Sequence, residues 1–374
     1  MLKAEENEIL TRVGPGTLMG ELLRRYWTPA CLTAEIPESG GAPARVRLLG
    51  EKLVAYRDRS GRGGLLQENC PHRGASLYFG RNEGAAIRCI YHGWAFDADG
   101  RCVDMPSEPQ PFCDRVRMRA YPTRESGGIV WAYLGPRETM TPFRDFGTEG
   151  HDAAEFMATK QATTCNWVQA MEGNLDTAHI SHLHQFDGTM VASIPFSVGH
   201  GMFVPIDDEN CWRYFVGPRH RPNPRNLGGA NLFSLAPFST PISAYTDGII
   251  PRRYTADNDY LIDRDTERTG IFSGVSDFVS QDLMVTESMG PIYDRTQEQL
   301  GSTDRAISRM RHILISAAKG LAEGKTPPAV GAGLDYTSIR GAEKILEPGE
   351  DWRLLGTDDD PVVQQALGHS STSR

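Results

Sequence analysis

Residues 70–94, CPHRGASLYFGRNEGAAIRCIYHGW, contain two short motifs, each of which places one cysteine and one histidine a few positions apart. Cys70 and His72 belong to the first motif, and Cys89 and His92 belong to the second. A thiolate and an imidazole at such short spacing can reach one metal centre from the tip of a single loop. The pattern therefore predicts two loops that hold one metal centre between them, and it places them in a small β-rich domain.

Two cysteines and two histidines are the ligands of a Rieske-type [2Fe–2S] cluster, in which two histidines replace two cysteines on one iron. The same side chains can also bind a structural zinc ion. Zinc modules usually pair cysteine with cysteine and histidine with histidine, whereas each motif here mixes the two types. The mixed pairing favours a cluster held by Cys70, His72, Cys89 and His92, with a zinc-stabilised β module as the alternative.

Composition excludes several classes of protein. The net charge of −9 and the pI of about 5.6 argue against a nucleic-acid partner, because binding a polyanion needs an excess of Lys and Arg. The first ten residues, MLKAEENEIL, lack the pattern of a signal peptide, and no apolar run reaches the roughly 20 residues that span a bilayer. Seven cysteines in 374 residues do not suggest a disulfide framework. We therefore expect a cytoplasmic protein without a membrane partner.

The chain is long enough for two domains. Residues 1–41 are expected to form an N-terminal helical segment, with Thr17 as a possible cap of a helix that reaches Trp27. Short strand-like runs separated by turn signals then predict a small antiparallel β domain over residues 42–136, which contains both motifs.

The remainder, residues 137–374, is predicted to be an α+β domain. Residues 137–160 are rich in Pro, Gly, Asp and Glu and are expected to form a connector. Helical periodicity follows from Asn166 to about Leu183, and strand-like segments come after it. Apolar residues at helical spacing predict a long helix over residues 306–321, capped by Ser302 or Thr303.

A second group of metal-binding residue types lies in residues 165–184, CNWVQAMEGNLDTAHISHLH. Asp176 and His179 are three positions apart and would share one face of a regular helix. His179 and His184 are five apart, which is about 140° around a regular helix and a poor arrangement for binding one ion. We therefore expect a break or bulge near His182.

Two imidazoles and one carboxylate form the facial triad that binds Fe(II) and leaves positions for O₂. The third ligand must come from another part of the chain, and Asp282 is the first candidate, with Glu287 as the second. Spacing alone leaves the site open, because His182 competes with both of its neighbours and the three histidines could also form a solvated face.

With both groups identified, the chain resembles the oxygenase (alpha) subunits of Rieske non-haem iron ring-hydroxylating systems, and most closely the phthalate dioxygenase branch. The resemblance rests on CPHRG, CIYHGW, the NW–EG–DxxHxxxxH pattern, QDxxxxExxGP, DMPSEP and the opening ENEILTRVGPGTLMGELLRRYW. It covers nearly the whole chain. It implies an antiparallel β Rieske domain and a catalytic domain of the helix-grip type, in which an antiparallel sheet packs with helices.

The resemblance also implies roles for individual residues. Cys70, His72, Cys89 and His92 would hold the [2Fe–2S] cluster, as expected above. A mononuclear iron would be held by His179, His184 and Asp282. Asp176 would hydrogen-bond His179 in its own chain and His92 of the partner subunit, so that electrons cross between subunits of a head-to-tail homotrimer or a stacked hexamer.

The activity implied is O₂-dependent hydroxylation of an aromatic acid, phthalate-like or phenoxybenzoate-like. Electrons would come from NAD(P)H through a separate flavin and iron–sulfur reductase, which agrees with the lack of a GxGxxG motif. O-demethylation of a methoxylated aromatic acid is the alternative within the enzyme class. An electron carrier that uses only the cluster is the alternative from another class.

One departure from the family concerns the substrate pocket. The segment between His184 and Asp282 is shorter than expected, and the shortfall lies just after His184. A carboxylate substrate would suit an arginine partner, yet no Arg or Lys stands between Lys160 and Arg213. An anchoring cation would therefore come from Arg213, Arg219 or a later residue, or from a lid segment that is missing here.

Overall fold

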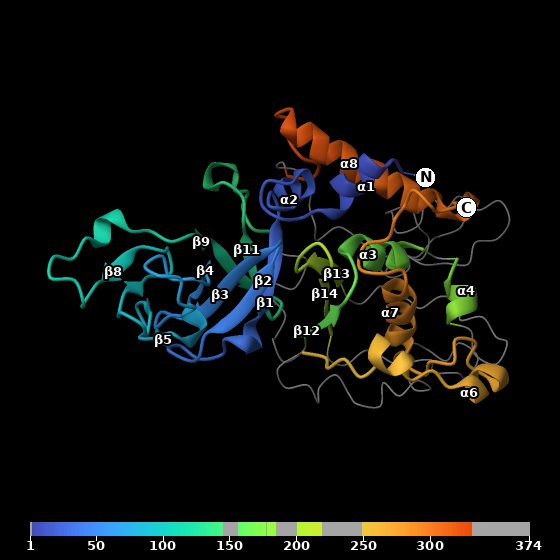
Figure 1. The fold of residues 1–374 in the computed structure, drawn as a ribbon, viewed down its shortest axis with the longest axis horizontal. Helices are drawn as coiled ribbons and strands as arrows, with labels where there is room; N and C mark the ends of the chain where they lie inside the picture. Colours follow the sequence, from blue (N-terminus) through green and yellow to red (C-terminus); the bar gives the residue numbers. More distant parts are fainter. Residues whose placement is uncertain (1, 145–155, 177, 185–199, 219–248, 331–374) are drawn as a thin grey trace, which may run out of the picture.

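The computed structural model describes residues 2–144, 156–176, 178–184, 200–218 and 249–330. The chain forms a β-rich part and a mixed part that lie next to each other along the long axis of the molecule (Figure 1). The antiparallel sheets and the helices packed on them confirm the predicted α+β class.

Three antiparallel sheets make up the β-rich part, residues 27–133, with the strand orders β1-β11-β10, β2-β3-β4-β9 and β5-β6-β7-β8. The strands are β1 Trp27–Leu32, β2 Ala44–Leu48, β3 Glu51–Arg57, β4 Gly63–Gln67, β5 Arg81–Asn82, β6 Ile87–Arg88, β7 Ala95–Phe96, β8 Cys102–Asp104, β9 Ala120–Tyr121, β10 Thr123–Ser126 and β11 Ile129–Tyr133. Short 3₁₀ turns connect them at η1 Thr33–Glu35, η2 Leu77–Phe79 and η3 Cys113–Arg115, and η4 Arg137–Thr139 follows.

The N-terminal segment is only partly helical. Helices α1 (Ala4–Thr11) and α2 (Leu18–Leu23) lie in it, and the Thr17 side chain caps α2 by accepting from the Gly20 N–H, as predicted. The helix does not reach Trp27, because Trp27 begins β1, which pairs with β11 more than a hundred positions later. This long-range pairing overrides the helical spacing of the leucines that precede it.

The mixed part contains one described sheet and most of the helices. The sheet has the order β12-β14-β13, and the elements are β12 Phe156–Thr163, α3 Trp167–Leu175, α4 Ile180–Leu183, β13 His200–Pro205, β14 Cys211–Pro218, η6 Ala256–Leu261, α6 Arg264–Thr269, α7 Phe278–Ser288, η7 Ser302–Asp304 and α8 Arg305–Ala322. The expected connector is wrong at its end, because Phe156 onward forms β12, which pairs with β14 over its whole length. Its polar composition concealed a strand that tertiary pairing stabilises.

Helix α8 lies across the top of the molecule in Figure 1, beside α1 and α2. Its buried residues include Ile307, Arg311, Ile315 and Ala318, which follow the spacing of one helical face. The predicted caps Ser302 and Thr303 are wrong: the N-cap is Asp304, whose carboxylate accepts from the Gly301 N–H at 2.6 Å.

One hydrophobic core joins the two parts. It contains Leu32 and Trp131 from the β1–β11 sheet, Tyr214 from β14 and Ile315 from α8. The N–H groups of Leu49 and Gly50, which follow β2, donate at 2.9 Å to the carbonyls of Pro205 and Ile206 at the end of β13. The cysteines are all free thiols. Among the described residues, no helix is both long and apolar enough to cross a bilayer.

Candidate iron centres

The two Cys–His motifs form a pair of similar loops. The first follows β4, and the second connects β6 to β7. In the first loop, the Gly74 N–H donates to the Cys70 carbonyl at 2.9 Å; in the second, the Gly93 N–H donates to the Cys89 carbonyl at 3.0 Å. Both glycines have positive φ, and a Cβ on Gly93 would lie 2.6 Å from Pro106. Each loop therefore closes by a similar tight turn that carries one cysteine and one histidine.

The side chains of the two loops face one another. The rings of His72 and His92 have centroids 4.3 Å apart. The His72 ring also stacks on Trp94, with centroids 4.4 Å apart and an interplanar angle of 8°. The Nδ1 atom of His72 is buried without a hydrogen-bond partner. A buried imidazole nitrogen without a partner suits a metal ligand, since leaving it unpaired costs free energy.

The sulfur atoms are also placed for a metal. Cys70 and Cys89 are both almost fully buried. Burial raises the pKa of the Cys70 thiol to about 11, the backbone N–H groups of His72 and Arg73 lower it, and the neighbouring Cys89 raises it. Thiols of this kind become thiolates at neutral pH when a metal binds them. The neighbouring sulfurs of Cys70 and Cys89 and the neighbouring rings of His72 and His92 fit a Rieske cluster.

The second group lies at the break between two helices. Helix α3 ends at Leu175, with Asp176 as its C-cap, and α4 begins after His179 and ends before His184. The break was predicted near His182, and this is wrong, because the helix has already ended at Asp176. Asp176 and His179 therefore do not share a helical face. The two histidines instead flank the single turn of α4, which lets both rings turn toward α7.

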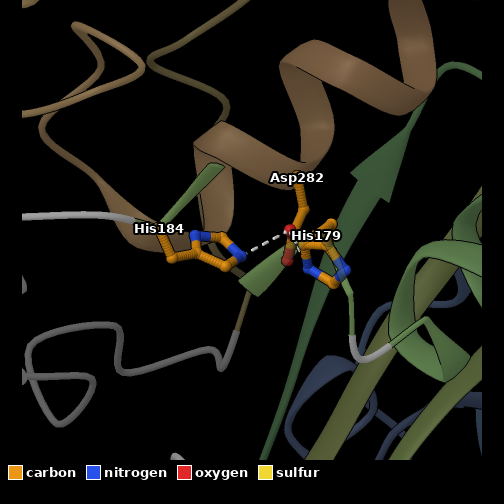
Figure 2. A group of neighbouring side chains, drawn as sticks. All are labelled: His179, His184 and Asp282. Atoms are coloured by element: carbon orange, nitrogen blue, oxygen red, sulfur yellow. Dashed lines mark ion pairs between the residues drawn. The ribbon is translucent and has the colours of Figure 1, made fainter. Parts of the chain in front are cut away.

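Three side chains converge there (Figure 2). The Nε2 atom of His184 lies 3.0 Å from Oδ1 of Asp282, and the Nε2 atom of His179 lies 3.6 Å from the same oxygen. One potential ligand atom from each residue lies within 4.8 Å of the other two. Two imidazole nitrogens and one carboxylate oxygen at these distances are a donor set that fits Fe(II).

The orientation of His184 is set by α7. Its Nδ1 lies 2.6 Å from Oε1 of Gln281, and Nε2 of Gln281 donates to the Val275 carbonyl at 2.6 Å. Because the Gln281 amide is held by Val275, its oxygen accepts from Nδ1–H, which leaves the lone pair on Nε2 of His184 for a metal. The ring also stacks on Phe278, with centroids 3.9 Å apart. Sequence analysis missed Gln281, although it is the residue before Asp282.

The charges around Asp282 favour its ionised form. Burial raises the pKa of this carboxyl, but hydrogen bonds with His179 and His184 and the charge of Arg213 outweigh burial and hold it well below its usual range. For His179, burial lowers the pKa, but the neighbouring carboxylates of Asp282 and Asp176 raise it more. The pKa of His179 therefore lies above its usual value. A carboxylate at this point is ready to bind a cation without first losing a proton.

The other two candidate carboxylates differ in position. Asp176 has Oδ2 at 3.7 Å from Nδ1 of His179, and its Oδ1 accepts from the Ala178 N–H at 2.7 Å. Glu287, the second candidate for the third ligand, is occupied elsewhere. Its side chain accepts from Arg252 at 2.6 Å and from Tyr260 at 2.7 Å. The structure thus brings Asp282, and not Glu287, to the two histidines.

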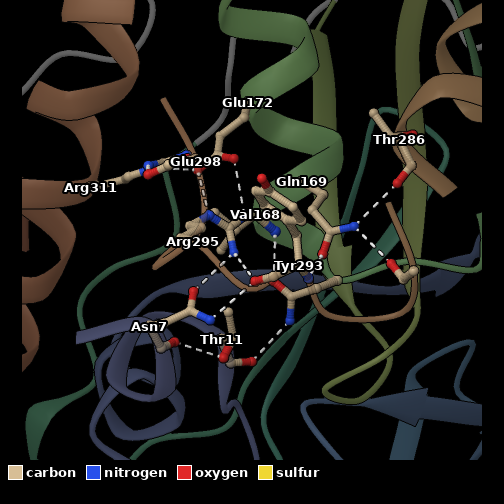
Figure 3. Close-up of polar contacts among 12 residues, drawn as sticks. Asn7, Thr11, Val168, Gln169, Glu172, Thr286, Tyr293, Arg295, Glu298 and Arg311 are labelled. Atoms are coloured by element: carbon tan, nitrogen blue, oxygen red, sulfur yellow. Dashed lines mark hydrogen bonds and ion pairs between the residues drawn. The ribbon is translucent and has the colours of Figure 1, made fainter. Parts of the chain in front are cut away.

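A buried polar network fixes α3, which leads into the site (Figure 3). Glu172 binds Arg295, whose Nη2 is 3.0 Å away, and Arg311, whose Nε is 2.6 Å away. On the neighbouring turn, Gln169 donates to the Thr286 carbonyl on α7 at 3.1 Å. These contacts hold α3 in register with α7 and α8, so that the end of α3 delivers Asp176 and His179 beside Asp282.

Comparison with protein families gives two matches. Residues 26–122 match the Rieske [2Fe–2S] domain. Residues 132–197 and 190–373 match the LigXa C-terminal domain like family. The second match falls in two stretches that overlap at residues 190–197.

Curated relatives cover almost the whole chain. The phthalate 4,5-dioxygenase oxygenase subunit of Pseudomonas putida is 32% identical, over 94% of this chain and 94% of its own. The 3-chlorobenzoate-3,4-dioxygenase oxygenase subunit of Comamonas testosteroni is 33% identical, over 94% and 97%. The 5,5'-dehydrodivanillate O-demethylase oxygenase subunit of a Sphingobium species is 33% identical, over 88% and 84%.

Solved structures show the same fold. Dicamba monooxygenase bound to dicamba has a TM-score of 0.56 at 19% identity, with 81% of this chain and 99% of that chain covered. A second structure is the reduced complex between oxygenase and ferredoxin in carbazole 1,9a-dioxygenase. It has a TM-score of 0.56 at 20% identity, with 83% of this chain and 94% of that chain covered.

Proposed function

Since this chain belongs to the oxygenase subunits of the Rieske non-haem iron ring-hydroxylating systems, we propose that its two iron centres are held by the two groups of side chains described above. Cys70, His72, Cys89 and His92 hold the [2Fe–2S] cluster. The observation that supports this assignment is the pair of matching loops, with a buried and unpartnered Nδ1 on His72.

The mononuclear iron is held by His179, His184 and Asp282. Bound there, the iron would supply the activation of O₂, with His179, His184 and Asp282 as its protein ligands. Asp282 contributes a carboxylate that is ionised before the metal arrives. Gln281 keeps the proton of His184 on Nδ1, away from the metal. Phe278 stacks on the same ring and shields it from water.

The reaction is the O₂-dependent hydroxylation of an aromatic acid. Relatives that match over nearly the full chain carry the names of dioxygenases for phthalate and 3-chlorobenzoate, which supports an acid substrate. O-demethylation of a methoxylated aromatic acid is the second candidate, because another relative at 33% identity is the oxygenase subunit of an O-demethylase. Both reactions would use the same iron ligands.

Electrons reach this subunit from a separate protein, which we propose to be fed by an NAD(P)H-dependent flavin and iron–sulfur reductase. The complexes of a similarly folded oxygenase with ferredoxin support a separate electron donor. Within one chain, the sheet that carries the second cluster loop and the helices α4 and α7 lie at opposite ends of the molecule (Figure 1). This separation supports a head-to-tail homotrimer, or a stack of two, in which the cluster of one subunit faces the mononuclear iron of the next.

Asp176 then bridges the subunit boundary between His179 and His92 of the partner subunit. Its Oδ2 lies 3.7 Å from Nδ1 of His179, so a small side-chain rotation completes the hydrogen bond. We further propose that residues 42–136 and 137–374 are the functional domains, preceded by the N-terminal segment 1–41. The strand β1, within that segment, completes a sheet of the first domain.

Oxygen uptake with a surrogate reductase tests the function. The candidate substrates are supplied in turn: phthalate, benzoate, 3-chlorobenzoate and a methoxybenzoate. The products that form under ¹⁸O₂ are then identified. A cis-diol carrying both labelled atoms indicates dioxygenation, and release of formaldehyde indicates demethylation.

Asp282→Ala is the control, which should keep the cluster absorption and lose oxygen uptake together with the mononuclear iron. An unaltered iron content in that variant contradicts the ligand assignment. A parent protein with only the cluster irons and no uptake is an electron carrier.

A further inference from the structure

From β12 onward, the described residues include five buried or half-buried lysine and arginine side chains, and four of them bind a carboxylate directly. Nζ of Lys160 is 2.6 Å from Glu35, Nη2 of Arg252 is 2.6 Å from Glu287, Nη2 of Arg295 is 3.0 Å from Glu172, and Nε of Arg311 is 2.6 Å from Glu172. Figure 3 shows the last two. The fifth, Arg213, is different. Its nearest carboxylate oxygen, Oδ2 of Asp282, is 3.6 Å away, which is too far for a hydrogen bond.

Arg213 stands beside the mononuclear iron site. It lies on β14, where it is paired with Gln161 of β12 and Phe203 of β13. Its side chain is 18% exposed, and its guanidinium lies 5.7 Å from the centre of the Phe203 ring. Asp282 separates the guanidinium from the histidines, since Oδ1 faces His184 at 3.0 Å and Oδ2 faces Arg213.

This arrangement leaves the guanidinium with donors to spare. An arginine carries five N–H donors in a planar fork that matches a carboxylate in two parallel hydrogen bonds. Within the part of the chain that the structure describes, the guanidinium of Arg213 makes no hydrogen bond, and its one ion pair, with Asp282, is 3.6 Å long. In a half-buried position, such a group favours an anionic ligand, because charge-assisted hydrogen bonds strengthen as water is excluded.

We propose that Arg213 binds the carboxylate of the aromatic acid substrate beside the mononuclear iron and thereby selects acids over neutral aromatic compounds. This inference rests on the proposed function, since it names the group that recognises the substrate of the same site. A carboxylate held by the fork lies about 2.8 Å from the arginine nitrogens. The distance from Arg213 to Asp282 then places the attached ring next to the metal, and the Phe203 ring gives it an apolar neighbour.

The test is equilibrium binding, measured by calorimetry on protein that carries its cluster, with the mononuclear iron present and after its removal by a chelator. The ligands are benzoate, phthalate, 3-chlorobenzoate and 4-methoxybenzoate, with methyl benzoate as the neutral counterpart. The variants are Arg213→Met and Arg213→Lys. Arg252→Met is the matched control, because Arg252 has the same 18% exposure and also pairs with a carboxylate on α7.

In Arg213→Met, we expect the affinity for at least one of these acids to fall about 10- to 100-fold, because charged hydrogen bonds to the carboxylate are lost. The affinity for methyl benzoate should equal that of the parent protein. The affinity of Arg213→Lys for the acids should lie between those of the parent and Arg213→Met, because an ammonium keeps the charge without the planar fork of donors. Arg252→Met should bind the acids as the parent does. The difference between acid and ester should persist without the mononuclear iron.

Three results would overturn the proposal. Arg213→Met could bind acids as tightly as the parent, all four acids could fail to bind the parent, or acid and ester could weaken equally as the iron content falls. The last result would mean that Arg213 only holds Asp282 in place. Oxygen uptake separates this proposal from the proposed function. If Arg213→Met binds the acids as tightly as the parent and still takes up oxygen, only the role of Arg213 is refuted. If acid binding depends on Arg213 but the parent protein takes up no oxygen, the proposed reaction is refuted.

Discussion

At the residue scale, one amide decides how His184 can act. Gln281 holds Nδ1 of His184 at 2.6 Å and is itself held by the Val275 carbonyl. Both Gln281 and His184 are almost completely buried, so no water can replace the amide easily. The partner of the second ring nitrogen sets the tautomer of a metal-binding histidine and commonly affects metal affinity.

Gln281→Leu should therefore weaken binding of the mononuclear Fe(II) about 10- to 100-fold while the cluster absorption stays unchanged. The leucine leaves Nδ1–H of His184 buried without an acceptor, and the ring can then adopt the tautomer that points a proton at the metal. Titration of the iron-depleted protein with Fe(II) measures the affinity. Gln281→Glu keeps an acceptor and should lose much less. Equal affinities of the leucine variant and the parent would show that Gln281 has no part in orienting His184.

At the element scale, the site depends on how closely α3 approaches α7. A Cβ placed on Gly173 of α3 would lie 3.3 Å from the Thr286 side chain of α7. Glycine inside a helix costs about 1 kcal/mol relative to alanine, so its presence here reflects the close approach of the two helices. His179 follows α3 and Asp282 lies on α7, so the distance between these ligands is set partly at Gly173.

Gly173→Val should separate the two helices and lower the content of mononuclear iron, with the cluster retained. The branched side chain needs more room than the contact with Thr286 provides. Iron analysis and the cluster absorption of the purified variants are compared. Gly173→Ala is the control, and it should retain most of the iron, because a small shift of Thr286 accommodates one methyl group. A valine variant with full iron content would mean that this contact does not set the ligand geometry.

The buried network around Glu172 should contribute strongly to stability. Removing one partner of a buried ion pair typically costs about 3–5 kcal/mol, and Arg295 is fully buried. We expect Glu172→Ala to lower the free energy of unfolding of the mixed part by about 3 kcal/mol, measured by urea denaturation. Glu8→Ala removes the exposed pair with Arg12 and should cost less than about 1 kcal/mol. Similar losses for the two variants would show that the network carries no special energy.

At the scale of the whole molecule, the two proposed iron sites lie toward opposite ends of one chain, and the proposed electron path crosses to a second subunit. Asp176→Asn should keep the cluster and the mononuclear iron, because Asp176 is not a ligand of either. It should slow oxidation of the reduced cluster by O₂ in the presence of an acid substrate by at least about 10-fold. Stopped-flow absorption measures this rate. Asp265→Asn, at an exposed position of α6, is the control, and an unchanged rate in Asp176→Asn would remove Asp176 from the path.

Much of this architecture was predictable from the sequence. The α+β class and the membership in the Rieske oxygenases are confirmed. Predictions over long distances were less successful. The segment before Trp27 was expected to continue as a helix, but β1 is decided by a partner strand that follows residue 128. The start of β12 was hidden in a polar stretch for the same reason.

The sequence by itself determined the two Cys–His loops, because a cysteine and a histidine within one tight turn are placed by local backbone geometry. Only the tertiary structure decided between Asp282 and Glu287, since both lie on α7 and the packing of α3 and α4 against it determines which carboxylate meets His179 and His184. The place of the helix break, the role of Gln281 and the position of Arg213 were decided in the same way. Contacts between distant segments depend on how whole elements pack, and short spacing in the chain carries no record of that packing.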